Sequence, residues 1–206
     1  YNQIYSQSTS GSKSLSNQWS RETELANILS FINPKDNVLD LGCGDGRFAR
    51  LTFGVKSIDA GLDKSPKEIK KARESGAYRQ VFALDAGEMP FDSGEFRSVV
   101  SNSVLEHMDH LEAVLKESAR VLSPGGKLVF TVPTPLVCRY QFWSKFIPGW
   151  AKFKKKIWRH INYFGEEGWQ KRLAGAGFEV INMKKTNSKA AISWADVFFP
   201  LSWSGP

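Results

Sequence analysis

The stretch Val38–Arg50, which reads VLDLGCGDGRFAR, decides the fold of this 206-residue chain. Its first four residues have the pattern of a short, largely apolar strand. A glycine-rich segment follows directly, and residues 47–53 have the composition of a helix that opens from it. In an open α/β sheet, a loop between a strand and the next helix lies at the carboxyl edge, where ligands bind. The pattern predicts a loop whose backbone approaches a ligand closely at Gly42, Gly44 and Gly46.

Strand and helix patterns alternate on both sides of this stretch. Helical spacing in residues 21–32 precedes it and ends at Asn33-Pro34. Further strands are expected at 56–63, 80–84, 98–101, 127–132 and 178–183, and helices at 67–74, 111–122 and 166–174. The apolar segment 190–199 fits either a seventh strand or a terminal helix. The alternation predicts an α/β, Rossmann-like, doubly wound and mostly parallel seven-stranded sheet with helices on both faces.

The composition is that of a globular protein with an uneven distribution of charge. The chain has 28 Lys and Arg against 21 Asp and Glu, and 41% of its side chains are apolar. Its two cysteines cannot form a disulfide framework, and no apolar run reaches the ~18 residues that a membrane-spanning helix needs. We expect a flexible arm over residues 1–20, rich in Ser, Asn and Gln, and a single domain over 21–206.

Residues 134–162 interrupt the alternation and are expected to form an aromatic and basic insertion. No Asp or Glu occurs from Ser118 to Gly165, whereas nine Lys or Arg do. Trp143–Arg159 interleaves aromatic and cationic side chains, which suits a lid over an apolar acceptor or a peripheral contact with anionic lipid. A packed cap with a solvated basic rim is the third interpretation. A nucleic-acid partner is disfavoured because no RNA-binding motif accompanies the aromatic residues.

Carboxylates follow the predicted strands at informative positions. Asp63 ends the second strand, 21 residues after Gly42, where an acidic residue can accept both hydroxyls of a ribose. Asp85 follows the third strand and is placed to receive the exocyclic amine of adenine. Asp40, inside the first strand, needs hydrogen-bond partners, either from a ligand or from the loop amides that it would cap. A nicotinamide dinucleotide is disfavoured because Arg47 stands where its fingerprint requires a glycine.

Taken together, these segments resemble class I S-adenosylmethionine-dependent methyltransferases of the type 11-like group. The resemblance covers about residues 22–183 and rests on several family motifs that occur in the family's order. These motifs are VLDLGCGDGRFAR at 38–50, GLDKS at 61–65, ALDAGEMPF at 83–91, VVSNSVLEHM at 99–108 and ESARVLSPGGKLVF at 117–130, followed by the late segment FGEEGWQKRLAGAGFEV at 164–180.

The resemblance implies a role for individual residues of this chain. Asp40 and the backbone of Gly42, Cys43 and Gly44 would hold the methionine part of S-adenosylmethionine. The nucleoside part would fall to Asp63 with Lys64 beside it, and to Asp85 and Ala86. Asn102 and Ser103 would line the edge of methyl transfer. No metal site is expected, and Cys43 stands where loop packing requires a small side chain.

Two histidines are candidate catalytic bases. A base is needed only for an acceptor that is protonated at neutral pH, and an unperturbed His titrates near ~6.5. His107 has a family-like position after the fourth strand, and His160 begins the return from the insertion. The alternatives are a histidine bonded to the backbone at a helix start for His107 and a buried structural role for His160.

The expected function is transfer of a methyl group from S-adenosylmethionine to an apolar small molecule, lipid or glycan. The motifs that go with amine or carbon-5 methylation of DNA bases, and the carboxylate cluster of metal-assisted catechol methylation, are not found in the sequence. The alternative is a non-catalytic subunit that keeps the cofactor pocket or associates with a membrane. A cytoplasmic location, with or without membrane association, is the accompanying expectation.

Overall fold

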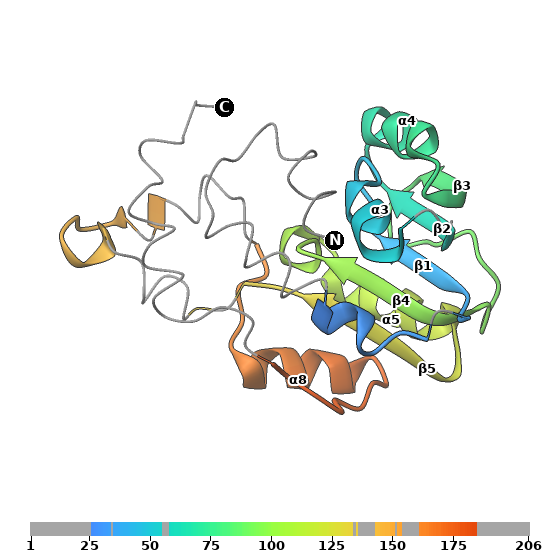
Figure 1. Ribbon diagram of the computed structural model, residues 1–206. Helices are drawn as coiled ribbons and strands as arrows, with labels where there is room; N and C mark the ends of the chain where they lie inside the picture. The colour runs from blue at the N-terminus through green and yellow to red at the C-terminus, as the bar shows by residue number, and fades with distance from the viewer. Residues whose placement is uncertain are drawn as a thin grey trace.

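A parallel five-stranded sheet organises the described part of the protein (Figure 1). The computed structural model describes residues 26–33, 35–54, 58–133, 135, 143–150, 152–153 and 161–184. The strands are β1 Val38–Leu41, β2 Ile58–Asp63, β3 Tyr78–Ala83, β4 Phe96–Asn102 and β5 Leu122–Thr131, in the order β3-β2-β1-β4-β5. The chain runs outward from β1 to β3 and then returns to the other side of β1. The topological switch point, where ligands bind in such sheets, therefore lies between β1 and β4.

Helices cover both faces of the sheet, as the alternating pattern predicted. Figure 1 shows α3 (Arg47–Phe53) and α4 (Pro66–Ser75) on one side, and α5 (Leu111–Val121) and α8 (Glu166–Gly175) on the other. The helical residues 26–29 join the first layer, because Ile28 packs with the core residues of α3. The larger core lies on the second side, between the strands and α5 and α8. The predicted α/β doubly wound fold is therefore confirmed.

Local sequence explains where two of these helices begin. Gly46 has φ +80°, which lets the chain turn sharply from the loop into α3. The Ser65 side chain accepts a hydrogen bond from the Glu68 amide and caps α4, whose first residue is Pro66. The Ser65 cap and Pro66 thus fix the start of α4 two to three residues after Asp63.

The prediction of seven strands is not confirmed. Residues 178–183, expected as a sixth strand, have no regular secondary structure, and residues 190–199 lie outside the described part of the chain. Phe178 and Val180 still pack against the main core, while Ile181 is 72% exposed. An extended segment with alternating side chains can bury one of its faces although its backbone forms no hydrogen bonds to a neighbouring strand, and such bonds define a strand in a sheet. β5 also differs, because its Leu122 pairs with Phe96 before a register shift separates it from the Lys127–Thr131 ladder.

The insertion is described only in part, and the expected arm at 1–20 lies outside the described residues. Within the insertion, η2 (Trp143–Lys145) begins a series of aromatic contacts, in which the Trp143 ring packs against Trp150 and the Trp150 ring packs against Phe153. The lysines at 154–156 and His160 are not among the described residues. As far as the structure describes the chain, no helix has the length and apolar character needed to cross a membrane.

Candidate functional site

The predicted glycine loop is fastened to the end of β2 by backbone hydrogen bonds. The amides of Gly42 and Cys43 both donate to the carbonyl oxygen of Leu62, at 2.7 and 3.0 Å. The next amide along, that of Gly44, donates to Oδ2 of Asp63 at 3.0 Å. The carboxyl ends of β1 and β2, which the sequence predicted to share the site, are thus held together.

Two of the loop glycines are required for different physical reasons. At Gly42, with φ +77°, an added Cβ would lie 2.3 Å from Val104 Cγ1, so the side chain that follows β4 fills the space. At Gly44, with φ +52°, an added Cβ would meet no atom of the described residues within 4 Å. The protein packs tightly against the loop at Gly42 and leaves the Gly44 backbone approachable, which fits a ligand laid along the loop.

Asp63 uses both carboxylate oxygens to order the backbone around it. Oδ2 receives the Gly44 amide, and Oδ1 receives the Ser65 amide at 2.8 Å. Each oxygen of an ionised carboxylate can accept a second hydrogen bond, so these contacts orient the group without using up its capacity. Asp63 is half-buried and Lys64 beside it is exposed. This arrangement is compatible with the predicted contact to ribose hydroxyls.

Asp40 is a buried carboxyl group directly below the loop. It is 1% exposed, and its Oδ2 accepts a hydrogen bond of 2.7 Å from the hydroxyl of Tyr78. Burial raises the pKa of Asp40 from 3.8 to about 7, while the Tyr78 hydrogen bond lowers it and the charge of Asp63 raises it further. Burial likewise raises the pKa of the Cys43 thiol, so this side chain stays neutral and acts in packing.

The loop after β3 carries the two residues predicted to meet adenine. Asp85 is exposed and its Oδ1 accepts the Gly87 amide at 2.8 Å, whereas Ala86 is buried. An ion pair on α5 braces the same loop, because Arg120 donates to the carbonyls of Met89 and Phe91 while Glu117 holds its guanidinium at two points. Residues of α5 therefore hold the part of this loop that follows Asp85.

The end of β4 contains a strained residue at the switch point. Ser103 has φ +56°, the one positive φ among non-glycine residues of the described chain. Its amide donates to the carbonyl of Thr131, and the Thr131 hydroxyl donates to Oδ1 of Asn102 at 2.6 Å. A left-handed conformation at a residue with a β-carbon costs of order 1–3 kcal/mol and is typical of functional sites. The two residues predicted to line the edge of methyl transfer, Asn102 and Ser103, thus lie at this strained turn.

The candidate base His107 lies in a turn that the end of the insertion holds in place. It ends η1 (Leu105–His107), and its Nε2 is 3.8 Å from the carboxylate of the buried Glu106. The side-chain amide of Asn162 donates to the carbonyls of Leu105 and Met108, at 2.9 and 2.6 Å. The amides of residues 161 and 162 both donate to the Glu106 carbonyl. His160, the other candidate, lies outside the described residues.

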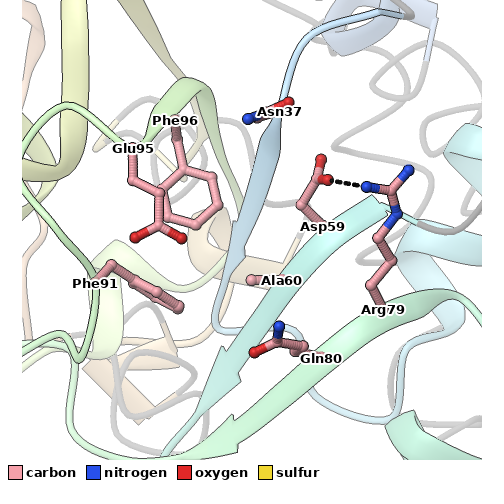
Figure 2. A pocket seen from close by; sticks show the side chains of 8 residues that line it. All are labelled: Asn37, Asp59, Ala60, Arg79, Gln80, Phe91, Glu95 and Phe96. Atoms are coloured by element: carbon pink, nitrogen blue, oxygen red, sulfur yellow. Dashed lines mark hydrogen bonds and ion pairs between the residues drawn. The ribbon is translucent and has the colours of Figure 1, made fainter.

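A cavity of about 180 Å³ lies at the opposite edge of the sheet and is separate from this site (Figure 2). Its lining comes from the residues that begin the strands, among them Asp59 of β2 and Arg79 of β3. Figure 2 shows these two side chains joined by an ion pair, with Nη1 and Oδ1 3.0 Å apart. Since the glycine loop and Asp63 lie where the strands end, the cavity does not contribute to the candidate site.

The residues at the carboxyl edge fit S-adenosylmethionine. The edge offers an approachable loop backbone at Gly44 and oriented carboxylates at Asp63 and Asp85, which match an amino acid joined to a nucleoside. Within the described ranges, no group of three His, Cys, Asp or Glu side chains is arranged to hold a metal. Sequence reasoning missed Tyr78, Val104, Thr131 and Asn162, whose roles depend on which residues face them across the sheet.

Comparison with known proteins identifies a matching family and proteins of similar sequence. The family described as "Methyltransferase domain" matches residues 15–182. An uncharacterized protein of Methanocaldococcus jannaschii is 30% identical over 153 residues, covering 74% of this chain and 69% of its own length. Demethylmenaquinone methyltransferase of Tropheryma whipplei is 29% identical, covering 61% of this chain. The chain matches 49% of the length of that enzyme.

A solved structure shows the same fold. The S-adenosylmethionine-dependent methyltransferase of Thermotoga maritima, described as a possible histamine N-methyltransferase, superimposes with a TM-score of 0.63 and 25% sequence identity. The match covers 81% of this chain and 74% of that one.

Proposed function

Because this chain belongs to the methyltransferase domain family, whose methyl donor is S-adenosylmethionine, we propose that it methylates an apolar small-molecule acceptor. The observation that carries the proposal is the junction of the glycine loop with Asp63, at the switch point of the sheet. The sulfonium of the cofactor supplies an activated methyl group, so the protein need only position the acceptor and exclude water.

The residues of this edge divide the work between the two ends of the cofactor. Asp40 and the loop at Gly42, Cys43, Gly44 and Gly46 would hold the methionine end. Asp63 would accept the ribose hydroxyls, with Lys64 beside it, and Asp85 and Ala86 would contact adenine. Asn102 and Ser103 would face the acceptor, at the strained turn that ends β4.

His107 is the described group best placed to accept a proton from the acceptor. It follows β4 by a short turn and has the Glu106 carboxylate close to its ring. Replacing His107 with Gln should lower turnover for hydroxyl acceptors, and the loss should be smaller when the acceptor is already ionised. An equal loss for both kinds of acceptor would argue against a role as base.

Calorimetric titration tests the proposal directly. We expect the chain to bind S-adenosylmethionine and S-adenosylhomocysteine with micromolar affinity. Folded protein that binds neither at millimolar concentration would contradict the proposed function. Once binding is established, transfer of a radiolabelled methyl group to a panel of quinones, phenols, lipids and glycans identifies the acceptor class. The quinones are included because one relative acts, by its name, on demethylmenaquinone.

A lipid-facing role for the insertion is supported by a separate observation. Phe146, Ile147 and Phe153 are 65%, 41% and 44% exposed, and the exposed Lys145 and Lys152 flank them. Exposed aromatic and aliphatic side chains beside lysines are typical of segments that lie on anionic lipid. The protein would then collect an apolar acceptor from a membrane surface. A subunit that binds the cofactor or the membrane without catalysing transfer is the alternative.

Vesicle co-sedimentation distinguishes these possibilities. We expect binding to phosphatidylglycerol vesicles and weak binding to phosphatidylcholine vesicles. The double variant Phe146→Glu/Ile147→Glu should abolish it, whereas Ile181→Glu, which changes a still more exposed apolar residue elsewhere, should not. Vesicle binding that persists in the double variant would exclude this segment as the contact. Vesicle binding without turnover on any acceptor would favour the non-catalytic alternative.

A further inference from the structure

Tyr78 reaches across the sheet to the buried carboxylate of Asp40. It is the first residue of the edge strand β3, yet its hydroxyl donates to Asp40 of β1, with β2 between them. The hydrogen bond is 2.7 Å long and uses Oδ2 of the carboxylate. From the described residues, the other oxygen, Oδ1, receives no hydrogen bond.

The path of the tyrosine ring depends on a glycine in β2. Gly61 pairs with Asp40 in the β1–β2 register, and a Cβ added there would lie 2.9 Å from both Cδ1 and Cε1 of Tyr78. Any other residue at this position would push the ring away from Asp40. The glycine and the tyrosine therefore form one arrangement that brings a hydroxyl to the carboxylate.

The same ring also packs against the end of the glycine loop. A Cβ added at Gly46 would lie 2.9 Å from Cε2 of Tyr78. Gly46 is the residue that turns the loop into α3. Tyr78 thus contacts both the base of the loop, through Asp40, and its far end, through Gly46.

Packing alone does not explain a carboxylate at this place. An apolar side chain in β1 would fill the space without the cost of burying a polar group. Burial raises the pKa of Asp40 to about 7, and the negative charge of Asp63 near it adds to this rise. A cationic group of a ligand would stabilise the ionised form of Asp40.

We propose that Tyr78 is a positioning residue for the methionine end of the cofactor: it holds Oδ2 of Asp40 and leaves Oδ1 for the ligand's ammonium group. This rests on the proposed function, since it assumes that S-adenosylmethionine binds at the glycine loop. It predicts that Tyr78 matters for ligands that carry the amino-acid part and is unimportant for those that do not. The adenosine end would be held by Asp63 and Asp85, which lie at and just after the carboxyl ends of β2 and β3, respectively.

The test compares two ligands that differ in that part. S-adenosylhomocysteine has the ammonium group, and 5′-methylthioadenosine lacks it. In Tyr78→Phe, which keeps the ring and removes the hydroxyl, we expect affinity for S-adenosylhomocysteine to fall about tenfold, as for a lost hydrogen bond to a charged group. Affinity for 5′-methylthioadenosine should change less than about twofold.

A matched control removes a different buried hydroxyl. Thr52→Val deletes the hydrogen bond to the Phe48 carbonyl in α3, which belongs to the same layer and does not touch Asp40. It should leave the ratio of the two affinities unchanged. Loss of both ligands to the same extent in Tyr78→Phe, or no loss beyond that of Thr52→Val, would overturn the inference. A wild-type chain that binds neither ligand would contradict the proposed function itself.

The pH dependence of binding gives a second readout. Affinity for S-adenosylhomocysteine should rise as Asp40 ionises, and the midpoint should move to higher pH in Tyr78→Phe, because the lost hydrogen bond stabilised the charged form. Asp40→Asn should reproduce the selective loss, and combining it with Tyr78→Phe should add little. Additive losses, or a midpoint that stays in place, would show that the two residues act separately.

Discussion

The backbone amide of Gly44 and the carboxylate of Asp63 are joined by a 3.0 Å hydrogen bond, although 19 residues separate them in the sequence. The contact ties the loop after β1 to the residue that ends β2. It explains how a flexible, glycine-rich segment can present a defined backbone to a ligand.

Replacing Asp63 with Ala removes the acceptor for the amides of Gly44 and Ser65 and the expected partner of the ribose. We expect affinity for S-adenosylhomocysteine to weaken by ~1–3 kcal/mol, measured by calorimetry. Asp45→Ala is the matched control, since the exposed Asp45 lies in the same loop and, among the described residues, accepts only the Arg47 amide. Equal affinities in the two variants would remove Asp63 from the site.

The buried Asp40 should make the stability of the protein depend on pH. Its folded-state pKa of about 7 lies above the usual 3.8, so between these values the folded state binds a proton that the unfolded state has released. The stability contributed by this group therefore falls as pH rises from about 4 to 7. Relative to wild type, Asp40→Asn should gain on the order of 2 kcal/mol in unfolding free energy between pH 5 and pH 8.

Urea denaturation at several pH values measures this difference. Because any cost of the new amide is independent of pH, only the change with pH tests the prediction. A constant difference between variant and wild type would mean that Asp40 is already ionised throughout.

Gly42→Ala should destabilise the fold through a collision with Val104. The left-handed backbone alone costs about 1–2 kcal/mol. Gly76→Ala measures that part, because Gly76 has φ +68° and no atom of the described residues lies within 4 Å of the new Cβ. We expect a further ~1–3 kcal/mol at Gly42 from overpacking. Val104→Ala in the same chain should recover some of it in urea denaturation. If Gly42→Ala and Gly76→Ala lower the free energy of unfolding by the same amount, the contact with Val104 is not tight.

Asn162 should stabilise the turn that carries His107. Asn162→Ala removes two hydrogen bonds from a side chain that is 8% exposed, for an expected cost of ~1–3 kcal/mol. Asn162→Asp should lower the free energy of unfolding further at pH 8, because an ionised carboxylate would face the carbonyls of Leu105 and Met108. Turnover should fall in both while affinity for S-adenosylhomocysteine is kept. A loss confined to cofactor affinity would place the role of Asn162 elsewhere.

Most of the architecture could be predicted from local sequence. The helix at residues 47–53 was predicted with the bounds that the structure shows, and the helices at 67–74, 111–122 and 166–174 were correct to within a residue at either end. These segments have strong periodicity and clear stops such as Gly76, and the helix at 67–74 also has the Ser65 cap. The sixth strand was predicted from alternation at 178–183, but alternation specifies which side chains are buried and cannot specify a hydrogen-bonded neighbour.

The sequence by itself determined the succession of strands and helices along the chain, the glycine loop and the acidic residues that follow the strands. Each of these features depends on residues that are close together in the chain. The tertiary structure alone decided which of these groups meet. Tyr78 lies 38 residues from Asp40, and Asn162 lies 57 from Leu105. Contacts of this kind depend on the order of the strands in the sheet and on their register. The Tyr78 contact also depends on Gly61, which lets the ring cross over β2. A shift of the β1–β2 register by one residue would move Gly61 away from Asp40 and close the path of the ring.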